Sequence, residues 1–369
     1  MEYIKLKDLC EKEERFVAPN DDAHIDYVDI SSVDNKSKSL TKYDTYIFAE
    51  APSRARKRVK HGDVIVSTVR PNLNAVARFN IQTPHTPIAS TGFCVLRHKS
   101  DVDPIYIYFF CISPNFVRQM VAKATGASYP AVSDTIVREA KLPKHTAEKR
   151  IRIVSTLSKA KEIIEHRRAQ LAKLDELVKC RFVEMFSHTQ CPHMEIQNIA
   201  EDVFAGGDKP KDIVETRDTL HPYPVFANGE VKRGLQGYSQ LCRVDKKAIT
   251  VSARGTIGYC CIRDAGFTPI VRLITLIPKE HINLTYLSEA IKFIGVGASG
   301  AVQAQLTVPD FKKIKIPLPS TNEQNAFADF VHRIDKLRFV VEMSHNHKHF
   351  TICGLVYLYA NPRLNLGFA

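Results

Sequence analysis

Residues 147–186 read AEKRIRIVSTLSKAKEIIEHRRAQLAKLDELVKCRFVEMF, a run of 40 residues without glycine or proline. Thr146 precedes this run and can cap its first turn, so the sequence predicts one long helix, which at 1.5 Å per residue spans roughly 60 Å. Apolar side chains recur in it at intervals of seven, the spacing with which one helix packs along another. These residues are Leu157, Ile164, Leu171, Val178 and Met185, with Leu174 as a companion position. Arg167 and Arg181 interrupt the companion row, which favours packing against a single partner helix.

The chain repeats the pattern that leads into this helix. Gly126–Pro143 reads GASYPAVSDTIVREAKLP and Gly300–Pro317 reads GAVQAQLTVPDFKKIKIP, an offset of 174 positions at both ends. Upstream, Gly62–Thr68 (GDVIVST) resembles Lys247–Ala253 (KAITVSA) at an offset of 185, so about 11 residues of loop differ between the copies. A period this long indicates a duplicated domain rather than a solenoid of short repeats.

Each copy combines short strands rich in Val, Ile and Thr with helices and turns. The predicted fold class is therefore α+β, with two pseudo-repeated α+β domains separated by long helices that pair as an antiparallel coiled coil. The second long helix opens with the capping box Ser320-Thr321-Asn322-Glu323 and carries apolar residues at Phe327, Ile334 and Val341. We expect a first domain at residues 1–146, a central helix at 147–187, a second domain at 188–320, a shortened second helix at 321–343 and an atypical tail at 344–369.

The tail departs from the repeat. The seven-residue periodicity of the second helix stops at Ser344, and Gly354, Pro362 and Gly367 follow, so no helix is predicted for residues 344–369. We hypothesise that a frameshift, a recombination or an early stop has replaced the distal part of this helix. The apolar row of the central helix is then expected to lack part of its partner.

Composition limits the class of protein. The 369 residues include 52 Lys and Arg against 40 Asp and Glu, a net charge of +12, and 44% are hydrophobic. This apolar content excludes intrinsic disorder, and no apolar run of about 18 residues is long enough to cross a membrane. Nine cysteines without a C-x-x-C pair indicate reduced thiols, and no secretory signal is visible. A basic, globular protein of the cytoplasm is expected.

Three features in this order, duplicated and attached to long helices, resemble the specificity (S) subunit of Type I restriction-modification systems. They are Gly62–Ser67, the turn Gly126-Ala127-Ser128-Tyr129-Pro130, and Leu142-Pro143 ahead of the helix, and the similarity covers roughly residues 2–343. The resemblance implies a non-catalytic chain whose two target-recognition domains each read half of a split target in double-stranded DNA. It implies that the helices fix the gap between the half-sites and dock methyltransferase (modification) subunits, two per chain by pseudo-symmetry, or one if the shortened helix removes a docking site. DNA cleavage would belong to restriction/translocase subunits. No cofactor is expected in this chain, since S-adenosylmethionine, ATP and Mg would be bound by the partner subunits.

Charge and hydrogen-bonding groups agree with contacts to DNA. Five of the seven residues from Arg54 to Lys60 are basic, which suits a loop that neutralises phosphates. Arginine pairs with guanine and asparagine with adenine, and such residues follow the predicted strand Val64–Val69 and its equivalent in the second copy. The DNA-binding candidates are Arg54, Arg56, Lys57, Arg58, Lys60, Arg70, Asn72, Asn74, Ser128 and Tyr129 in the first domain, and Asn228, Lys232, Arg233, Arg254, Thr256, Gln303 and Gln305 in the second. For each of them a solvated or structural role stays open as the alternative.

Other motifs carry less weight. Gly295-x-Gly297-x-x-Gly300 has the spacing of a dinucleotide-binding turn but follows a predicted helix, where that motif needs a strand. His345, His347 and His349 alternate, yet a short His-rich stretch often binds metal by accident, so neither a metal site nor a catalytic residue is expected. Two alternatives stay open: a standalone DNA-binding protein that clamps two sites without an enzyme partner, and a nuclease of unrecognised type. Co-purification of a methyltransferase tests the first, and cleavage of DNA with Mg²⁺ tests the second.

Overall fold

The computed structural model describes residues 2–12, 14, 16–187, 191–295 and 305–346. It divides into two compact units, and the boundary between Arg167 and Arg168 falls inside the longest helix. We call residues 2–167 unit 1 and residues 168–344 unit 2. The tail at 347–369 and Gln303 lie outside the described residues. Among the helices described, none is long and apolar enough to cross a membrane.

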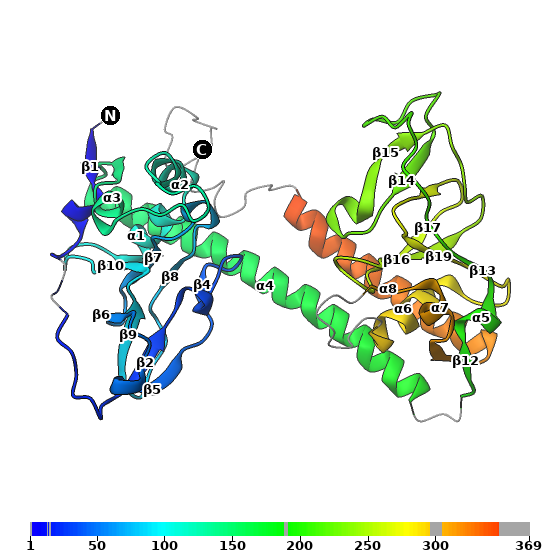
Figure 1. The fold of residues 1–369 in the computed structure, drawn as a ribbon, viewed down its shortest axis with the longest axis horizontal. Helices are drawn as coiled ribbons and strands as arrows, with labels where there is room; N and C mark the ends of the chain where they lie inside the picture. Colours follow the sequence, from blue (N-terminus) through cyan, green and yellow to red (C-terminus); the bar gives the residue numbers. More distant parts are fainter. Residues whose placement is uncertain (1, 13, 15, 188–190, 296–304, 347–369) are drawn as a thin grey trace. The chain divides into compact units, whose positions relative to one another are not determined.

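Unit 1 mixes strands and short helices (Figure 1). Its four-stranded sheet has the order β5-β2-β9-β6, and its three-stranded sheet has the order β10-β7-β8. The strands are β1 (Tyr3–Lys5), β2 (His24–Val28), β3 (Val33–Asp34), β4 (Ser39–Leu40), β5 (Asp44–Ile47), β6 (Ala55–Arg58), β7 (Val64–Ser67), β8 (Val76–Arg78), β9 (Thr86–Ser90), β10 (Phe93–Leu96) and β11 (Lys141–Pro143). The helices are η1 (Leu6–Leu9), η2 (Ile30–Ser32), η3 (Phe48–Glu50), η4 (Pro71–Leu73), α1 (Pro104–Cys111), α2 (Pro114–Val121) and α3 (Asp134–Arg138).

Unit 2 is built from the same kinds of element. A four-stranded sheet has the order β13-β19-β16-β17 and a three-stranded sheet the order β15-β14-β18. The strands are β12 (His193–Glu195), β13 (Ala200–Ala205), β14 (Tyr223–Phe226), β15 (Leu235–Ser239), β16 (Ala248–Val251), β17 (Cys260–Arg263), β18 (Thr268–Pro269), β19 (Ile274–Pro278) and β20 (Lys315–Pro317). The helices are α5 (Ile196–Ile199), η5 (Val231–Gly234), α6 (Leu284–Ile294) and α7 (Val308–Lys312).

The duplication predicted from the sequence is confirmed in backbone detail. In unit 1, β1 pairs antiparallel with β11 and places Tyr3 opposite Pro143; in unit 2, β12 pairs with β20 and places His193 opposite Pro317. The short helix before each of these closing strands is capped by a hydroxyl, that of Ser133 for α3 and that of Thr307 for α7, 174 positions apart. A side-chain oxygen at this position accepts a backbone N–H that has no partner within the helix. The two copies therefore share both pairing and capping chemistry.

Helix α1 and helix α6 also correspond. Asp103 caps α1 and Asn283 caps α6, each with its side-chain oxygen. Tyr106 of α1 and Tyr286 of α6 stand at the same distance from these caps, and both are buried. Each unit packs such a helix against its own apolar core, which includes Val64, Leu96 and Ile107 in unit 1 and Ile249, Leu276 and Leu287 in unit 2.

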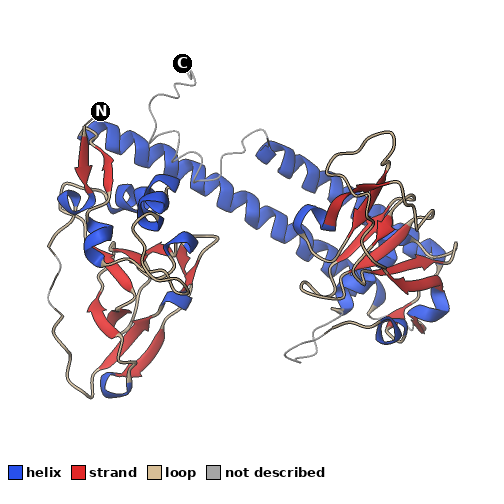
Figure 2. Cartoon of the chain, turned by 45° about the horizontal axis from the view of Figure 1, so that its top comes forward, coloured by secondary structure: helices blue, strands red, loops and turns tan. Residues whose placement is uncertain are grey.

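The chain contains two long helices in addition to the elements above (Figures 1 and 2). Helix α4 (Ala147–Phe186) extends through both units, and helix α8 (Thr321–Asn346) belongs to unit 2 up to Ser344. The predicted capping box at the start of α8 is confirmed, because the Ser320 N–H donates to a Glu323 carboxylate oxygen at 2.9 Å and the Glu323 N–H donates to the Ser320 hydroxyl at 3.4 Å. Described backbone continues to Asn346, three residues beyond the expected end of the second helix.

The predicted pairing of the long helices holds for the second half of α4. Val178, Phe182 and Phe186 pack in one cluster with Phe327, Val331 and Ile334 of α8. Arg338, farther along α8, binds the Asp175 carboxylate at 2.7 Å, so the two helices run antiparallel. The prediction of one continuous seam is wrong for Leu157, which packs into the core of unit 1 instead. A helix that carries two domains presents its apolar row to each of them in turn.

Candidate nucleic-acid interface

The loop after strand β7 presents three of the predicted residues. Arg70 and Asn74 bracket η4 with left-handed φ values of 49° and 50°, conformations that cost energy for residues other than glycine. The Arg70 N–H donates to the Pro130 carbonyl at 2.7 Å, and its exposed guanidinium lies 4.8 Å from the centre of the Tyr129 ring. Asn72 is exposed, whereas the Asn74 side-chain amide donates to the Cys111 carbonyl at 2.9 Å. Arg70 and Asn72 are thus presented to solvent, and Asn74 holds the loop on α1.

The turn at Gly126–Pro130 lies beside this loop. Gly126 has a φ of +99°, and a Cβ at this position would lie 2.9 Å from the Tyr129 carbonyl oxygen, so the tight turn requires glycine. Ser128 and Tyr129 are exposed, Tyr129 to 69%. An exposed arginine, asparagine, hydroxyl and aromatic ring therefore gather on two loops that are 56 or more positions apart in the chain. Such a ring and guanidinium can stack on bases or on sugars.

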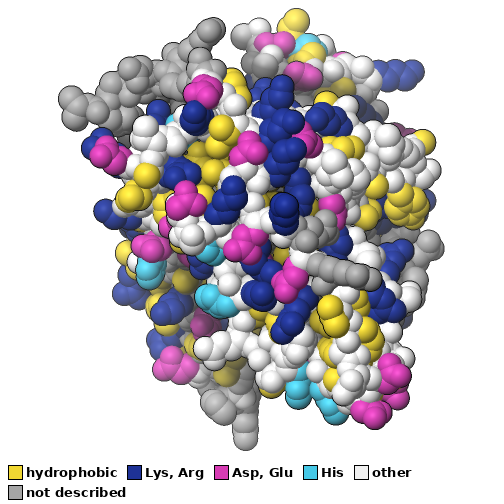
Figure 3. All heavy atoms as spheres, turned by 90° about the vertical axis from the view of Figure 1, so that its left-hand side faces the viewer, with side chains coloured by type: hydrophobic (Ala, Val, Ile, Leu, Met, Phe, Trp, Pro, Cys, Tyr) yellow, Lys and Arg dark blue, Asp and Glu magenta, His cyan; other side chains and the backbone are white. Residues whose placement is uncertain are grey.

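The basic segment is a strand rather than the loop that we expected. Residues 55–58 form β6 at the edge of a sheet, with Ala55 and Val59 buried and Arg56 and Arg58 exposed between them. The alternation buries small apolar residues and leaves the charged heads in water, which is why a segment this basic can pair as a strand. Lysine and arginine side chains gather near the middle of the face shown in Figure 3, with acidic side chains set among them.

The basic side chains of this segment differ in their partners. Lys57 forms an ion pair with Asp134, and Lys60 lies 3.3 Å from a Glu14 carboxylate oxygen. The Arg56 guanidinium covers the Phe48 ring at 5.5 Å. Within the described parts of the chain, the guanidinium groups of Arg54 and Arg58 form no ion pair. Arg54 and Arg58 are therefore the members of the segment best placed to meet phosphates.

In unit 2, Asn228 is a structural residue of the loops. Its side-chain oxygen accepts the Ala253 N–H at 2.8 Å and its amide donates to the Val271 carbonyl at 2.6 Å. Arg254 follows Ala253, is exposed, and donates to the Gln305 side-chain oxygen at 2.9 Å. The asparagine that the sequence offered as a base reader thus uses both polar atoms of its side chain to hold the loop that carries Arg254.

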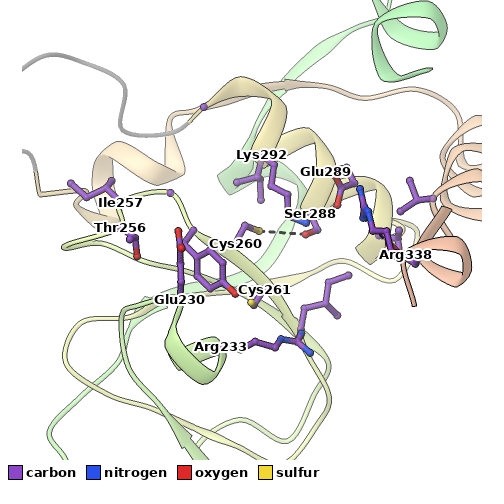
Figure 4. Close-up of a pocket in the computed structure, with 18 of the residues that line it drawn as sticks. Glu230, Arg233, Thr256, Ile257, Cys260, Cys261, Ser288, Glu289, Lys292 and Arg338 are labelled. Carbon is purple, nitrogen blue, oxygen red and sulfur yellow. Dashed lines mark hydrogen bonds and ion pairs between the residues drawn. The ribbon is translucent and has the colours of Figure 1, made fainter. Parts of the chain in front are cut away.

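Arg233 and Thr256 line a cleft of about 1270 Å³ in unit 2 (Figure 4), whereas Lys232 lines a second cavity of about 460 Å³, which Arg233 also lines. Lys232 and Arg233 have left-handed φ values of 49° and 54°, and Arg233 donates to the Ile262 carbonyl at 3.2 Å. Arg233 and Thr256 line the cleft together with Glu230, Glu289, Lys292 and Arg338. Both acidic and basic groups line it, so this cleft does not present the uniformly basic surface that DNA favours.

Cys260 lines the cleft, and its thiol is buried. The Cys260 Sγ lies 3.5 Å from the Ser288 Oγ (Figure 4), and burial raises the pKa of the thiol to about 11. At neutral pH this cysteine is protonated, and the thiolate is the reactive form. Across the described ranges, no three His, Cys, Asp or Glu side chains gather as a metal site would require.

Sequence reasoning missed Arg263 and Arg272. Arg263 is 6% exposed, covers the Phe226 ring at 3.8 Å and donates to the Thr250 hydroxyl at 2.9 Å, so it supports the sheet under the loops. Arg272 is exposed with a φ of 58°, next to Val271, whose carbonyl binds Asn228. Neither residue follows a glycine, asparagine or proline that would have marked a turn, so the sequence holds no local signal for them.

Comparison with known proteins finds similarity to specificity subunits. Residues 200–342 match the family model described as the Type I restriction modification DNA specificity domain. One Mycoplasma pneumoniae protein named as a type I specificity subunit is 30% identical over 221 residues, which are 58% of this chain and 59% of the relative. A second from the same organism is 37% identical over 136 residues, which are 37% of this chain and 41% of the relative. The matches thus span less than two thirds of either relative's own length.

The fold has a counterpart among solved structures. The crystal structure of a Type I restriction-modification system S subunit from M. genitalium superposes with a TM-score of 0.57 over 97% of this chain and 93% of that chain, at 13% identity. The duplicated units and the long helices of the fold agree with these matches: residues 200–342 match a Type I restriction modification DNA specificity domain, and the chain is similar to proteins named as type I specificity subunits.

Proposed function

We propose that this chain is a non-catalytic subunit that recognises a bipartite sequence in double-stranded DNA and directs methyltransferase and restriction subunits to it. Unit 1 reads one half of the target and unit 2 reads the other. The observation that carries the proposal is the duplication. In each unit the strand within the repeated segment, β7 or β16, ends in a loop with an exposed arginine, Arg70 or Arg254. Two similar DNA-contacting units that share helix α4 suit a target with two halves and a gap.

The long helices supply the surface for protein partners. Beyond the cluster that pairs α8 with α4, helix α8 exposes Leu337, Phe339 and Val340 to 52%, 61% and 63%. Exposed apolar residues on one helix are typical of a protein interface. In the proposed assembly this part of α8 docks a methyltransferase subunit. Methyl transfer from S-adenosylmethionine and ATP-driven, Mg-dependent cleavage belong to the partner subunits.

Methylation mapping tests the proposal. The chain is co-expressed with the methyltransferase encoded beside it, purified through a tag on this chain, and methylated adenines are mapped across a host genome by single-molecule sequencing. We expect methylation at one split motif with a fixed gap and two short defined halves. A complex that methylates a single undivided site would contradict the bipartite reading, and purification of a DNA-binding chain without a partner would support a standalone DNA-binding protein instead.

Two sets of substitutions separate reading from positioning. Replacing Arg254 with Ala should relax the preference at one half-site by about 1 to 3 kcal/mol, because a bidentate contact to a base is lost. Replacing Arg54 and Arg58 together with Gln should weaken binding to all DNA sequences alike and reduce its dependence on salt. Binding is measured by fluorescence anisotropy on the mapped target and on scrambled duplexes. An equal loss on both duplexes for Arg254→Ala would show that Arg254 is not a base reader.

A further inference from the structure

Unit 1 contains a polar cavity of its own, behind the loop at η4. Its volume is about 330 Å³, and it lies where strand β8, helix α1, the first half of α4 and the β3–β4 turn meet. The residues that carry its chemistry are Arg78 and Lys161, the hydroxyls of Ser39, Tyr108 and Ser158, and Lys38. Glu162 and Glu165, both exposed, stand at its α4 side.

Of the three basic side chains that line this cavity, Arg78 and Lys161 are not fully neutralised by acidic groups. Arg78 is half-buried and, among the residues that the structure describes, makes neither a hydrogen bond nor an ion pair with its guanidinium. Lys161 donates to the Tyr108 hydroxyl at 3.2 Å and approaches the Glu165 carboxylate only to 3.7 Å. Burial lowers the pKa of Lys161; the Glu165 carboxylate opposes this, and the charge of Arg78 adds to it. A half-buried guanidinium without a partner beside a second cation favours an anion in the cavity.

The repeat shows that these cations are particular to unit 1. The offset of 174 along the long helices places Asp335 of α8 where α4 has Lys161. Arg78 of β8 pairs with Val64, and its counterpart in unit 2 is Ile262 of β17, which pairs with Ile249. Ile262 and Asp335 both line the cleft of unit 2, so the two cavities occupy corresponding places in the two copies. Unit 2 forms the same fold without these two cations, so folding alone does not explain why unit 1 has Arg78 and Lys161.

Lys38 connects the cavity to the loop at η4. Its ammonium donates to the Leu73 carbonyl at 3.3 Å and also to the Asn74 carbonyl. Its own carbonyl accepts the Tyr108 hydroxyl at 3.0 Å, and Tyr108 is the residue to which Lys161 donates. A short series of contacts therefore joins the cation on α4 to the loop that presents Asn72.

We propose that Arg78 and Lys161 bind a phosphate group, and that its source is the backbone of the DNA whose half-site unit 1 reads. The inference rests on the proposed function for the source of the phosphate. A guanidinium can bind two phosphate oxygens at once, an ammonium supplies a compact second charge, and the Ser39 and Ser158 hydroxyls are further donors. A cavity of this size holds a single phosphate group with part of its sugar.

The first experiment measures how DNA binding depends on salt. The chain, in complex with its methyltransferase, is titrated with the mapped duplex at several salt concentrations for wild type, Arg78→Gln, Lys161→Gln and the double variant. The double variant should bind about tenfold or more weakly on every sequence, and its slope of log K against log salt should fall by about 0.9, the value for one lost phosphate contact. Lys161→Arg, which keeps the charge, should restore most of the binding. Lys159→Gln removes an exposed cation from the same helix outside the cavity and should leave the slope close to wild type.

The second experiment uses inorganic phosphate without DNA. The unfolding temperature of unit 1 is compared in phosphate and in chloride at equal ionic strength, for wild type and for the double variant. Phosphate should raise it more in wild type than in the variant, and the variant corrects for the general stabilising effect of this salt.

The outcomes separate the two sources of phosphate. Loss of both the slope and the phosphate effect in the double variant supports a contact to the DNA backbone. Loss of the phosphate effect with an unchanged slope overturns the DNA source and assigns the cavity to a free phosphate-bearing molecule. No difference in either measurement overturns the site. If the wild-type complex binds no duplex, the proposed function fails. The phosphate measurement then still shows whether Arg78 and Lys161 bind phosphate.

Discussion

The two units place opposite chemistry at the same position of their sheets. In unit 1 the buried Asp63 carboxylate accepts hydrogen bonds from Arg97 at 3.1 and 2.8 Å and from the Lys60 N–H at 2.8 Å. The register of β16 with β19 puts Ala248 and Ile277 at the corresponding positions of unit 2. The copies have thus kept the path of the backbone and exchanged an ion pair on a buried carboxylate for an apolar pair.

This difference shows which structural features the two copies share and which they do not. Strand pairing, the helix caps and the buried tyrosines recur because they close the same fold. Buried charge does not recur, since well-packed apolar residues can replace an ion pair at little or no cost in stability. The charged groups that differ between the units, here and in the cavity of Arg78 and Lys161, are therefore the places where the two copies have acquired separate properties.

The largest effect is expected from a charge in the helix cluster of unit 2. Val178→Asp places a carboxylate among Phe182, Phe186 and Ile334 and should cost about 5 kcal/mol, enough to unfold unit 2, even though Lys292 and Arg338 line the same small cavity as Val178. Unit 1 should stay folded because the second half of α4 contributes nothing to its core. Hydrogen exchange read by mass spectrometry reports both units at once.

The control for this prediction is Leu177→Asp, one position away and 46% exposed, which should leave exchange unchanged. Leu157→Asp should give the reverse pattern, with unit 1 unfolded and unit 2 protected. Loss of protection in both units from either core substitution would contradict the division of α4 between two cores.

The exchanged ion pair gives the next prediction. Asp63→Ala leaves the Arg97 guanidinium, which is also paired with Glu14, without its buried partner and should destabilise unit 1 by about 3 to 5 kcal/mol. Adding Arg97→Ile copies the arrangement of unit 2 and should recover most of that loss. Urea unfolding monitored in unit 1 measures both. A double variant no more stable than Asp63→Ala would show that the surroundings in unit 1 require the charges.

The equivalent tyrosines allow a finer comparison. The Tyr286 hydroxyl donates to the Pro317 carbonyl at 2.6 Å in a fully buried position, so Tyr286→Phe should cost about 1 kcal/mol or slightly more. The Tyr106 hydroxyl lies 2.8 Å from His145 Nδ1, and burial raises the pKa of Tyr106 to about 12. Tyr106→Phe should cost less, because the half-buried His145 can turn towards water. Thermal unfolding of each unit ranks the two, and a reversed order would contradict this reasoning.

The smallest effect concerns acid stability. Hydrogen bonds and charge from Lys5 and Lys7 lower the pKa of the Glu139 carboxyl from 4.5 to about 2. A carboxyl with a lowered pKa stabilises the fold above its unfolded value, and this contribution is lost as the pH falls from about 4.5 towards 2. Glu139→Gln should therefore make the unfolding midpoint of unit 1 less sensitive to pH in that range.

Unit 2 is the internal reference for this measurement. The repeat places Lys313 where unit 1 has Glu139, with Glu195 and Gln197 where unit 1 has Lys5 and Lys7. The pH dependence of unit 2 should be the same in Glu139→Gln and in wild type. A change in unit 2 alone would contradict the assignment of the acid effect to Glu139.

Most of the fold could be predicted because its signals are local. Three local signals indicate backbone structure directly. They are the 40-residue run without glycine or proline, the capping box at Ser320 and the two repeat landmarks at a single offset. The strand β6 was missed because five basic residues in seven obscured the alternation of Ala55 and Val59 with exposed side chains. The split of the apolar row of α4 was missed because periodicity shows that a face is buried and does not show against what.

The candidate site could be predicted only in part. Arg70, Asn72 and Tyr129 are exposed, as a contact to DNA would require, whereas Asn74 and Asn228 bind carbonyl groups 37 and 43 positions away. Such partners depend on tertiary structure, so the sequence could not distinguish an asparagine that reads a base from one that holds a loop. Arg78 and Lys161 were missed for the same reason, since 83 residues separate two side chains that share one cavity.

The position of the boundary between the units has a consequence for inheritance. The boundary falls inside α4, so a genetic crossover in the codons near Arg167 and Arg168 interrupts neither core. If the two parental halves join in the same reading frame and at the same helical phase, the recombinant chain again forms one continuous helix. A recombinant gene would then encode two intact units of different ancestry. New combinations of the two units could thus arise in one event, without passing through misfolded intermediates.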